Sequence, residues 1–257
     1  MFEFLKYLVK SGHSKGHGIH SPFVYDLVSR VFRNKIDRNI VNSVEQIRKK
    51  LISDSRIIRV NDLGSGSGSG QKNERKVSDI ARRSPVTLKY GILLANLAAE
   101  FGKPAIIELG TSFGISTMYL AAPDKETKVY TLEGSSEIAG IARQNCIEAG
   151  LGNIEILEGS FEELLPGLAL RSIKPGLVFI DGDHRKKPVL NYFEKIAEMS
   201  DSNTVIIIDD INYSREMRET WEEIKLNDRV SVTIDLFRMG ICFFRKGINH
   251  NNYIIRY

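Results

Sequence analysis

The sequence predicts an α/β fold with a doubly wound, mostly parallel sheet. Five short apolar runs, each ending in an acidic residue or a glycine, are Ala105–Glu108, Val129–Glu133, Ile154–Gly159, Leu177–Asp181 and Val205–Asp210. Continuous apolar runs without polar alternation are typical of parallel strands buried on both faces. Segments of helical length separate the runs, which gives the strand–helix–strand order of such a fold. Ligands bind outside the carboxyl ends of these strands, so we expect the site there.

The expected elements follow this rhythm to the end of the chain. Strands are expected at 105–109, 128–133, 153–158, 176–181 and 204–209, and helices at 113–122, 135–149, 161–170, 187–199 and 214–226. Two further apolar segments, 230–236 and 240–244, are separated by a short connection that is typical of a hairpin. The prediction is therefore a Rossmann-like sheet of seven strands that ends in a C-terminal antiparallel hairpin.

The first part of the chain predicts a helical N-terminal extension over residues 1–83, followed by the sheet domain over 84–257. Ser21 and Pro22 form a helix-start signal, with serine as the N-cap and proline at the first helical position. Further helices are expected over 1–10, over 42–52 and from Ser84 to Phe101. The Gly/Ser-rich stretch 62–70 is interpreted as a flexible linker.

Composition narrows the class of protein. The chain has 257 residues, of which 42% are hydrophobic and 26% are charged, as in ordinary soluble globular proteins. No apolar run approaches the roughly 18 residues that a membrane span needs, so no membrane partner is expected. Cys146 and Cys242 are isolated and form neither a disulfide framework nor a zinc pattern. We therefore expect a cytoplasmic protein.

Charge is distributed unevenly along the chain. Residues 1–105 carry 19 Lys and Arg against 9 Asp and Glu, a net of +10, and the remainder carries 17 against 23, a net of −6. A basic first part is compatible with a polyanionic substrate such as a nucleic acid, and equally with a solvated basic surface. Charge alone leaves both open.

Two glycine-rich stretches compete as a ligand-binding loop. A loop that cradles a nucleotide-like ligand needs a strand before it and a helix after it. The stretch from Glu108 to Gly114 satisfies this rule, because an apolar run precedes it and an apolar helix start follows it, whereas the stretch from Asp62 to Gly70 does not. The binding turn is therefore predicted at Gly110, Thr111, Ser112 and Gly114.

The predicted turn does not suit a phosphate group. It lacks the Gly-Lys-Ser/Thr ending of a Walker loop and the three spaced glycines of the dinucleotide fingerprint. Glu108 would repel a pyrophosphate and attract a cation such as a sulfonium. Glu133 ends the next strand, where a ribose-binding acid belongs.

These residues together resemble a known family. The turn from Glu108 to Gly114, Glu133 and the terminal hairpin resemble class I S-adenosylmethionine-dependent methyltransferases. The segments Phe179–His184 and Ile208–Asp210 are similar to those of the metal-dependent small-molecule O-methyltransferases, which include the catechol, caffeoyl-CoA and macrolide-sugar enzymes. The resemblance covers about residues 84–246.

The resemblance implies a role for each matching residue. S-adenosylmethionine would lie against Glu108, Gly110, Thr111, Ser112, Gly114, Glu133, Gly134, Gly159, Ser160, Phe161 and Asp181, with Glu133 on the ribose and Ser160 and Phe161 beside the adenine. Mg²⁺ would be held by Asp181, Asp209 and Asp210. His184 would be the general base, so that His184 and Asp181 are the predicted catalytic residues.

The residues themselves are compatible with that chemistry. Three carboxylates at neighbouring strand ends suit a hard divalent ion such as Mg²⁺, which lowers the pKa of a bound hydroxyl. His184 could then accept the proton near neutral pH. Acids at these strand ends can equally be capping groups or cofactor contacts, as in metal-free methyltransferases.

Three functions remain in competition at this stage. The favoured one is O-methylation of a small hydroxylated molecule, with the N-terminal extension shaping the acceptor site. The second is an RNA methyltransferase whose basic stretch 72–89 holds phosphates. The third is a non-catalytic module that binds S-adenosylmethionine. The expected partner is a small-molecule acceptor, and a homodimer stays open.

Overall fold

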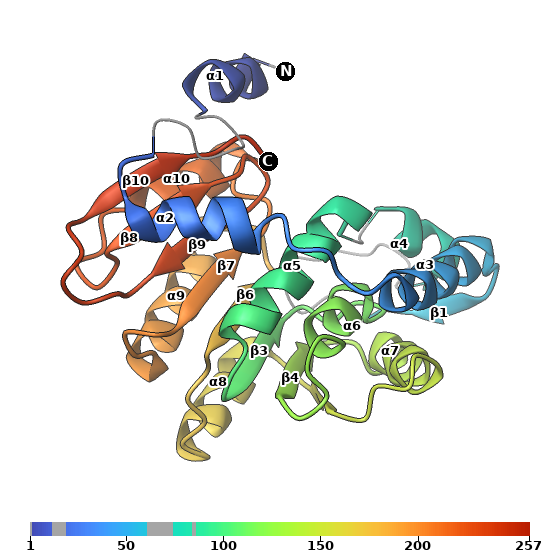
Figure 1. Ribbon diagram of the computed structural model, residues 1–257. Helices are drawn as coiled ribbons and strands as arrows, with labels where there is room; N and C mark the ends of the chain where they lie inside the picture. Colours follow the sequence, from blue (N-terminus) through green and yellow to red (C-terminus); the bar gives the residue numbers. More distant parts are fainter. Residues whose placement is uncertain (1, 12–18, 61–73, 84–85) are drawn as a thin grey trace.

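The computed structural model describes residues 2–11, 19–60, 74–83 and 86–257, and it forms three layers with a sheet in the middle (Figure 1). The helices are α1 Phe2–Lys10, α2 Pro22–Asp26, the π-helical turn η1 Leu27–Val31, α3 Arg38–Ser53, α4 Val77–Arg83, α5 Leu88–Phe101, α6 Ile115–Ala121, α7 Ser136–Glu148, α8 Phe161–Leu170, α9 Lys186–Met199 and α10 Arg215–Ile224. The predicted linker at 62–70 lies outside the described residues.

The main sheet contains eight strands in the order β10-β8-β9-β7-β6-β3-β4-β5. Their bounds are β3 Ala105–Leu109, β4 Lys128–Glu133, β5 Ile154–Glu158, β6 Leu177–Ile180, β7 Val205–Ile208, β8 Val232–Asp235, β9 Gly240–Phe243 and β10 Asn251–Ile254. Strands β3 to β7 pair in parallel, and β9 pairs antiparallel with both β7 and β8. The predicted α/β sheet and its antiparallel hairpin are confirmed.

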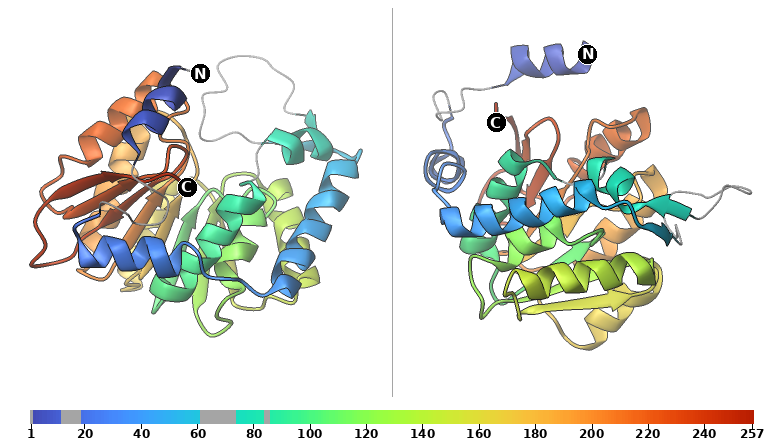
Figure 2. Two further views of the ribbon diagram at one scale, coloured as in Figure 1. Left: turned by 45° about the horizontal axis from the view of Figure 1, so that its top comes forward. Right: turned by 90° about the vertical axis from the view of Figure 1, so that its right-hand side faces the viewer.

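Helices cover both faces of the sheet, as Figures 1 and 2 show. Alternate strand residues enter opposite cores: Ile106 and Phe179 belong to one buried cluster, and Ile107 and Val178 belong to the other. The first cluster also contains residues of η1, α3, α5 and α6, and the second contains residues of α8, α9 and α10. The apolar runs lack polar alternation because both of their faces are buried.

Two features of the sheets were not predicted. Strand β10 adds an eighth strand that pairs in parallel with β8, and β1 (Ile57–Arg59) pairs antiparallel with β2 (Glu74–Lys76) in a separate small sheet. These strands are only three or four residues long, and each is largely exposed or half-buried. Such segments carry no apolar pattern, so their pairing depends on where the folded chain places them.

The N-terminal helices share one hydrophobic core with the sheet. Ser21 caps α2 as predicted, because its side chain accepts a hydrogen bond from the backbone N–H of Val24. Leu51 of α3 is buried in the cluster that also holds Phe113 and Met118. The extension therefore packs beside the predicted glycine turn.

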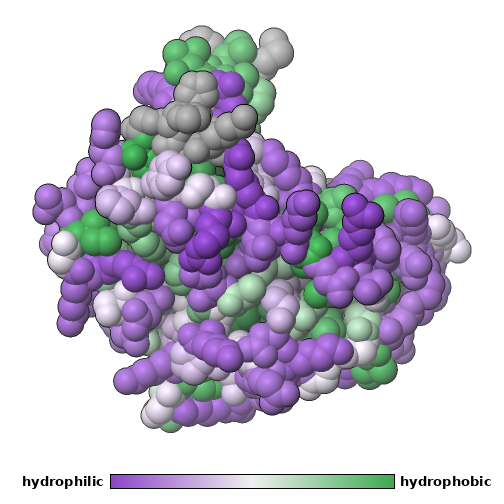
Figure 3. All heavy atoms as spheres, viewed as in Figure 1, coloured by the Kyte–Doolittle hydropathy of each residue, from purple (hydrophilic) through white to green (hydrophobic). Residues whose placement is uncertain are grey.

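Helix α1 lies against the end of the chain. The Tyr7 hydroxyl donates to the Ile255 carbonyl at 2.6 Å, and Arg256 Nη2 donates to the Leu8 carbonyl at the same distance. Phe4, Leu5 and Val9 are exposed on this helix. Hydrophobic surface is visible at the top of the molecule, where α1 lies (Figure 3). Among the helices that the structure describes, none has the length and apolar character needed to cross a membrane.

Asn153 joins the start of β5 to the loop between α6 and β4. Its buried side-chain amide donates to the carbonyls of Ala121, Asp124 and Thr127 at 2.8–3.2 Å.

Replacing Asn153 by alanine leaves these three carbonyls without their donor, and we expect the free energy of unfolding to fall by about 1–3 kcal/mol. Urea denaturation measures this loss. The exposed Asn191 of α9 is the control, since Asn191→Ala should change stability by less than about 0.5 kcal/mol; equal effects would contradict the role of Asn153.

Candidate functional site

The glycine turn follows β3 and opens α6, as predicted. Gly110 has φ +102° and Gly114 has φ +82°, a backbone region that favours glycine. A Cβ atom at Gly110 would lie 2.2 Å from the backbone oxygen of Asp181. The backbone N–H groups of Gly110 and Thr111 donate to the Leu132 carbonyl. The turn thus packs closely against the end of β6 and is hydrogen-bonded to the end of β4.

Glu133 reaches the turn from the end of β4. Its Oε2 accepts the backbone N–H of Ser112 at 2.9 Å, and its Oε1 accepts the N–H of Ser135 at 3.0 Å. Gly134, which follows, is half-buried. The predicted proximity of this acid to the turn is confirmed.

Glu108 lies beneath the turn and is fully buried. The hydroxyls of Thr117 and Thr131 donate to its Oε2 at 2.5 and 2.6 Å, while its Oε1 has no hydrogen-bond partner among the described residues. Burial raises the pKa of Glu108 to about 7, and hydrogen bonds from Ser116 and the two threonines oppose this shift. Near neutral pH this carboxyl is poised between its two protonation states.

The residues after β5 lie at the same edge. Gly159 donates its backbone N–H to the Glu133 carbonyl, and the Ser160 hydroxyl caps α8 by accepting the N–H of Glu163. The Phe161 ring lies so close to Gly182 that a Cβ there would be 2.6 Å from it. The structure thus places Gly159 beside the end of β4 and Phe161 beside the segment that follows β6.

An acidic cluster forms where β6 and β7 end. Asp181 donates its N–H to Leu109, and Asp209 donates its N–H to Ile180, so the two carboxylates project from adjacent strand ends. His184 Nε2 lies 4.0 Å from Asp181 Oδ1 and 4.0 Å from Asp210 Oδ2. All four residues predicted here from sequence, the three aspartates and the histidine, are brought together.

Burial and mutual repulsion perturb this cluster. Burial, followed by the charges of Asp209 and Asp210, holds the pKa of Asp181 well above its ordinary value. Burial and the Asp209 charge likewise raise the pKa of Asp210. Burial lowers the pKa of Arg238, but its hydrogen bond to Asp209 and the three acids raise it in net. Burial and the charges of the neighbouring groups therefore act together on the pKa values of this cluster.

The predicted magnesium ligands do not form a metal site in this arrangement. Asp209 is fully buried and is engaged by the Arg238 guanidinium, with Nε 3.0 Å from Oδ1 and Nη2 2.8 Å from Oδ2. Within residues 2–11, 19–60, 74–83 and 86–257, no group of three or more His, Cys, Asp or Glu is arranged to hold an ion. The geometry does not support the predicted magnesium site, because the Asp209 carboxylate is paired with an arginine from the β8–β9 connection.

Arg238 is a site residue that the sequence interpretation missed. Residues 237–240 were interpreted only as a hairpin connection. Because β9 runs antiparallel to β7, with Gly240 opposite Ile208, this connection lies at the same edge as the carboxyl ends of the parallel strands. The antiparallel pairing of the hairpin with β7 was the one signal that could have identified Arg238 as a site residue.

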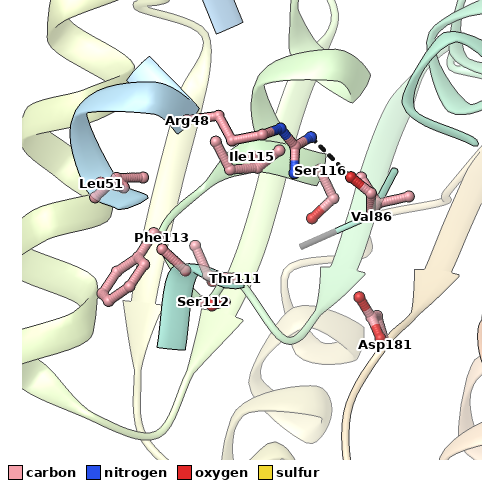
Figure 4. A pocket seen from close by; sticks show the side chains of 10 residues that line it. Arg48, Leu51, Val86, Thr111, Ser112, Phe113, Ile115, Ser116 and Asp181 are labelled. Carbon is pink, nitrogen blue, oxygen red and sulfur yellow. Dashed lines mark hydrogen bonds between the residues drawn. The ribbon is translucent and has the colours of Figure 1, made fainter. Parts of the chain in front are cut away.

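A pocket lies between the glycine turn and the N-terminal helices (Figure 4). Its cavity volume is only about 20 Å³, far below the roughly 300–1,000 Å³ of small-molecule sites, so in this structure it is a small hollow beside the turn. Its walls are Arg48 and Leu51 of α3, Ala81, Val86, Thr111, Ser112, Phe113, Ile115, Ser116 and Asp181. The N-terminal extension thus supplies one wall of the site.

Arg48 is the second residue that the sequence interpretation missed. Its Nη2 donates to the Val86 carbonyl at 2.7 Å, and its Nε pairs with Glu45 at 3.1 Å. In Figure 4 the side chain reaches past Ile115 toward Val86. No motif marks this arginine, because its position depends on how α3 packs on α6.

The buried Glu108 predicts a pH dependence of stability. Its pKa rises from 4.5 in the unfolded chain to about 7 in the folded one, so the folded state binds more protons between these values. Its stabilising contribution is therefore present below pH 4.5 and is lost as the pH rises through 7, a change of about 3 kcal/mol. Glu108→Gln should remove this loss, so that the stability of the variant relative to wild type increases from pH 5 to pH 8.

Urea denaturation at several pH values measures the difference. The control is Glu155→Gln, which removes a surface carboxylate that pairs with Arg171. The control should keep the pH profile of the wild-type protein. Parallel profiles for wild type and Glu108→Gln would contradict the assignment.

Comparison with known proteins agrees with this geometry. A family model described as a methyltransferase domain matches residues 107–211, from β3 to the end of the acidic cluster. The chain is 38% identical over 106 residues to a protein named "Putative O-methyltransferase" from Mycobacterium sp. (strain JLS), covering 40% of this chain and 47% of the relative. It is 31% identical over 131 residues to the catechol O-methyltransferase of Mycobacterium tuberculosis, covering 50% and 58%. The chain thus spans about half the length of the curated relatives it matches.

Solved structures share the fold over most of the chain. An O-methyltransferase from Bacillus cereus in complex with SAH superposes with a TM-score of 0.57 at 24% identity, covering 86% of this chain and 97% of that one. The O-methyltransferase TomG from Streptomyces achromogenes, in complex with SAM, gives 0.58 at 18% identity and covers 86% and 96%. At these identities the likeness concerns the fold.

The family match spans the same strands and turns that form the site. The turn after β3, the acid after β4 and the acidic residues after β6 and β7 all fall inside residues 107–211. Residues 107–211 therefore match a methyltransferase domain, and this part of the chain is similar to proteins named O-methyltransferases.

Proposed function

We propose that this protein binds S-adenosylmethionine and transfers its methyl group to a hydroxyl oxygen of a small molecule. The observation that carries the proposal is the Glu133 carboxylate held 2.9 Å from the Ser112 N–H at the glycine turn. A carboxylate at the end of this strand is suited to accept hydrogen bonds from the hydroxyls of a ribose. The names of the relatives support the choice of oxygen as the acceptor.

When bound, the cofactor would supply a methyl group attached to a positively charged sulfur. Transfer of this methyl to an acceptor oxygen would leave S-adenosylhomocysteine as the second product. Glu133 would hold the ribose hydroxyls, and Phe161 would offer an aromatic surface to the adenine. Glu108 lies beneath the turn, and its Oε1 has no hydrogen-bond partner among the described residues; in its ionised form this carboxylate would place negative charge close to the cationic end of the cofactor. The chain would thus recognise both ends of one ligand.

His184 is the residue suited to remove the acceptor proton. Its Nε2 lies 4.0 Å from a carboxylate oxygen of Asp181 and 4.0 Å from one of Asp210, so the imidazole faces the acidic cluster at the strand ends. The His184 ring also lies 5.7 Å from the Tyr213 ring, which limits its orientations. A general base held in this way typically contributes roughly 10²–10⁴-fold to the rate.

Magnesium is not part of this proposal. The donor set that the resemblance implied does not fit a metal, because Arg238 occupies both oxygens of Asp209. The steps assigned to His184 and Glu133 need no ion.

Removing Glu133 should weaken cofactor binding. Hydrogen bonds to a charged acceptor contribute about 1.5–3 kcal/mol each, so we expect Glu133→Ala to lower the affinity for S-adenosylhomocysteine at least roughly 10-fold. Glu133→Gln keeps the size and one acceptor oxygen, and should lie between wild type and Ala. Isothermal titration calorimetry measures the affinities. The control is Glu155→Ala, a surface acid on β5, which should bind as wild type does. An unchanged affinity in Glu133→Ala would remove the main support for the proposal.

Replacing His184 should slow transfer without weakening cofactor binding. With methyl-labelled S-adenosylmethionine and a panel of phenols, catechols and sugars, we expect wild type to label a hydroxylated acceptor and His184→Gln to be roughly 10²-fold slower or worse. Its affinity for S-adenosylhomocysteine should stay within about 3-fold. His250→Gln is the control, because His250 contacts the Val230 carbonyl at the opposite edge of the sheet. Full activity in His184→Gln would exclude this base.

A further inference from the structure

The buried carboxylate of Asp209 has an unusual partner for a site of this kind. The side chain of Asp209 is fully buried, and that of Arg238 is 25% exposed. Arg238 donates from Nε to both Asp209 oxygens, at 3.0 and 3.2 Å, and from Nη2 to Oδ2 at 2.8 Å. A buried carboxylate must be paired, and the planar fork of a guanidinium satisfies both oxygens together. Both oxygens thus already accept hydrogen bonds from the guanidinium.

The same guanidinium reaches a second acid of the cluster. Arg238 Nε lies 3.5 Å from Asp210 Oδ1. Asp181 and Asp210 in turn face His184 at 4.0 Å each. The positive charge of Arg238 thus lies among the three acids that would otherwise attract a divalent ion, and an ion placed there would be repelled by it.

Arg238 is held in place by its own turn. Phe237 has φ +70°, and its carbonyl accepts a hydrogen bond from the Asn212 side chain at 2.8 Å. The Arg238 carbonyl accepts the N–H of Ile211 at 3.0 Å, so the turn is tied to the segment that carries Asp209 and Asp210. The Tyr90 ring lies 5.8 Å from the guanidinium. Contacts on several sides therefore fix the position of the Arg238 side chain in the site.

We propose that Arg238 takes the place of the divalent cation that this fold often uses, so that the acidic cluster is neutralised from within and binds no Mg²⁺ or Mn²⁺. The inference deepens the proposed function, because it names the positive charge that serves the same site. It also follows that removing the guanidinium should open Asp209, Asp181 and Asp210 to a metal ion.

The test is a titration with Mn²⁺, followed by the electron paramagnetic resonance signal of the free ion. We expect no stoichiometric binding by wild type and an affinity at least 10-fold higher in Arg238→Ala. The gain should disappear in the double variant Arg238→Ala/Asp209→Asn. Arg238→Lys, which keeps a positive charge, should resemble wild type. Where Arg238→Ala does not fold, Arg238→Gln gives the same neutral site with a side chain of similar length.

Two outcomes would overturn the inference. One is stoichiometric Mn²⁺ binding by wild type that Asp209→Asn abolishes. The other is a folded Arg238→Ala or Arg238→Gln that gains no affinity. Calorimetry with S-adenosylhomocysteine on the same wild-type sample reports on the proposed function separately, since a failure to bind that ligand would leave the metal result standing.

Discussion

The site depends on one close approach, that of the glycine turn to the end of β6. The backbone of Gly110 touches the carbonyl of Asp181 where a side chain would lie 2.2 Å away. The Asp181 N–H bonds to Leu109 at 2.8 Å, so the two strand ends are joined at this point. Because the turn lies directly on the end of β6, it has Glu133 on one side, which accepts the Ser112 N–H, and Asp181 of the acidic cluster on the other. A bulkier residue at this one position would separate both halves of the site.

The parallel sheet concentrates negative charge at this edge, and each acid is stabilised differently. Threonine hydroxyls donate to Glu108, backbone N–H groups donate to Glu133, and a guanidinium pairs with Asp209. Burial, followed by the charge of Asp209, raises the pKa values of Asp181 and Asp210. Burying an unpaired charge is costly, so the partners of these acids decide which of them remain ionised. The chemical properties of the site therefore depend on the groups that pair with these acids as much as on the acids themselves.

The N-terminal helices complete the site from outside the region that the family model matches. Helix α3 brings Arg48 and Leu51 to the wall of the pocket, and the Tyr119 hydroxyl of α6 donates to Glu45 of α3 at 3.1 Å. Under the proposed function these helices close the turn against water, which strengthens electrostatic interactions inside.

The amino-acid sequence by itself determined the α/β class, the five parallel strands, the glycine turn and the acids at the strand ends. These features are local, because a strand buried on both faces and a glycine turn each leave a pattern in consecutive residues. Tertiary structure alone decided the partners: Arg238 with Asp209, Arg48 with the pocket, and β10 with β8. Arg238 and Asp209 are 29 positions apart. Contacts over such separations depend on how strands and helices pack, and no periodicity or spacing records that packing.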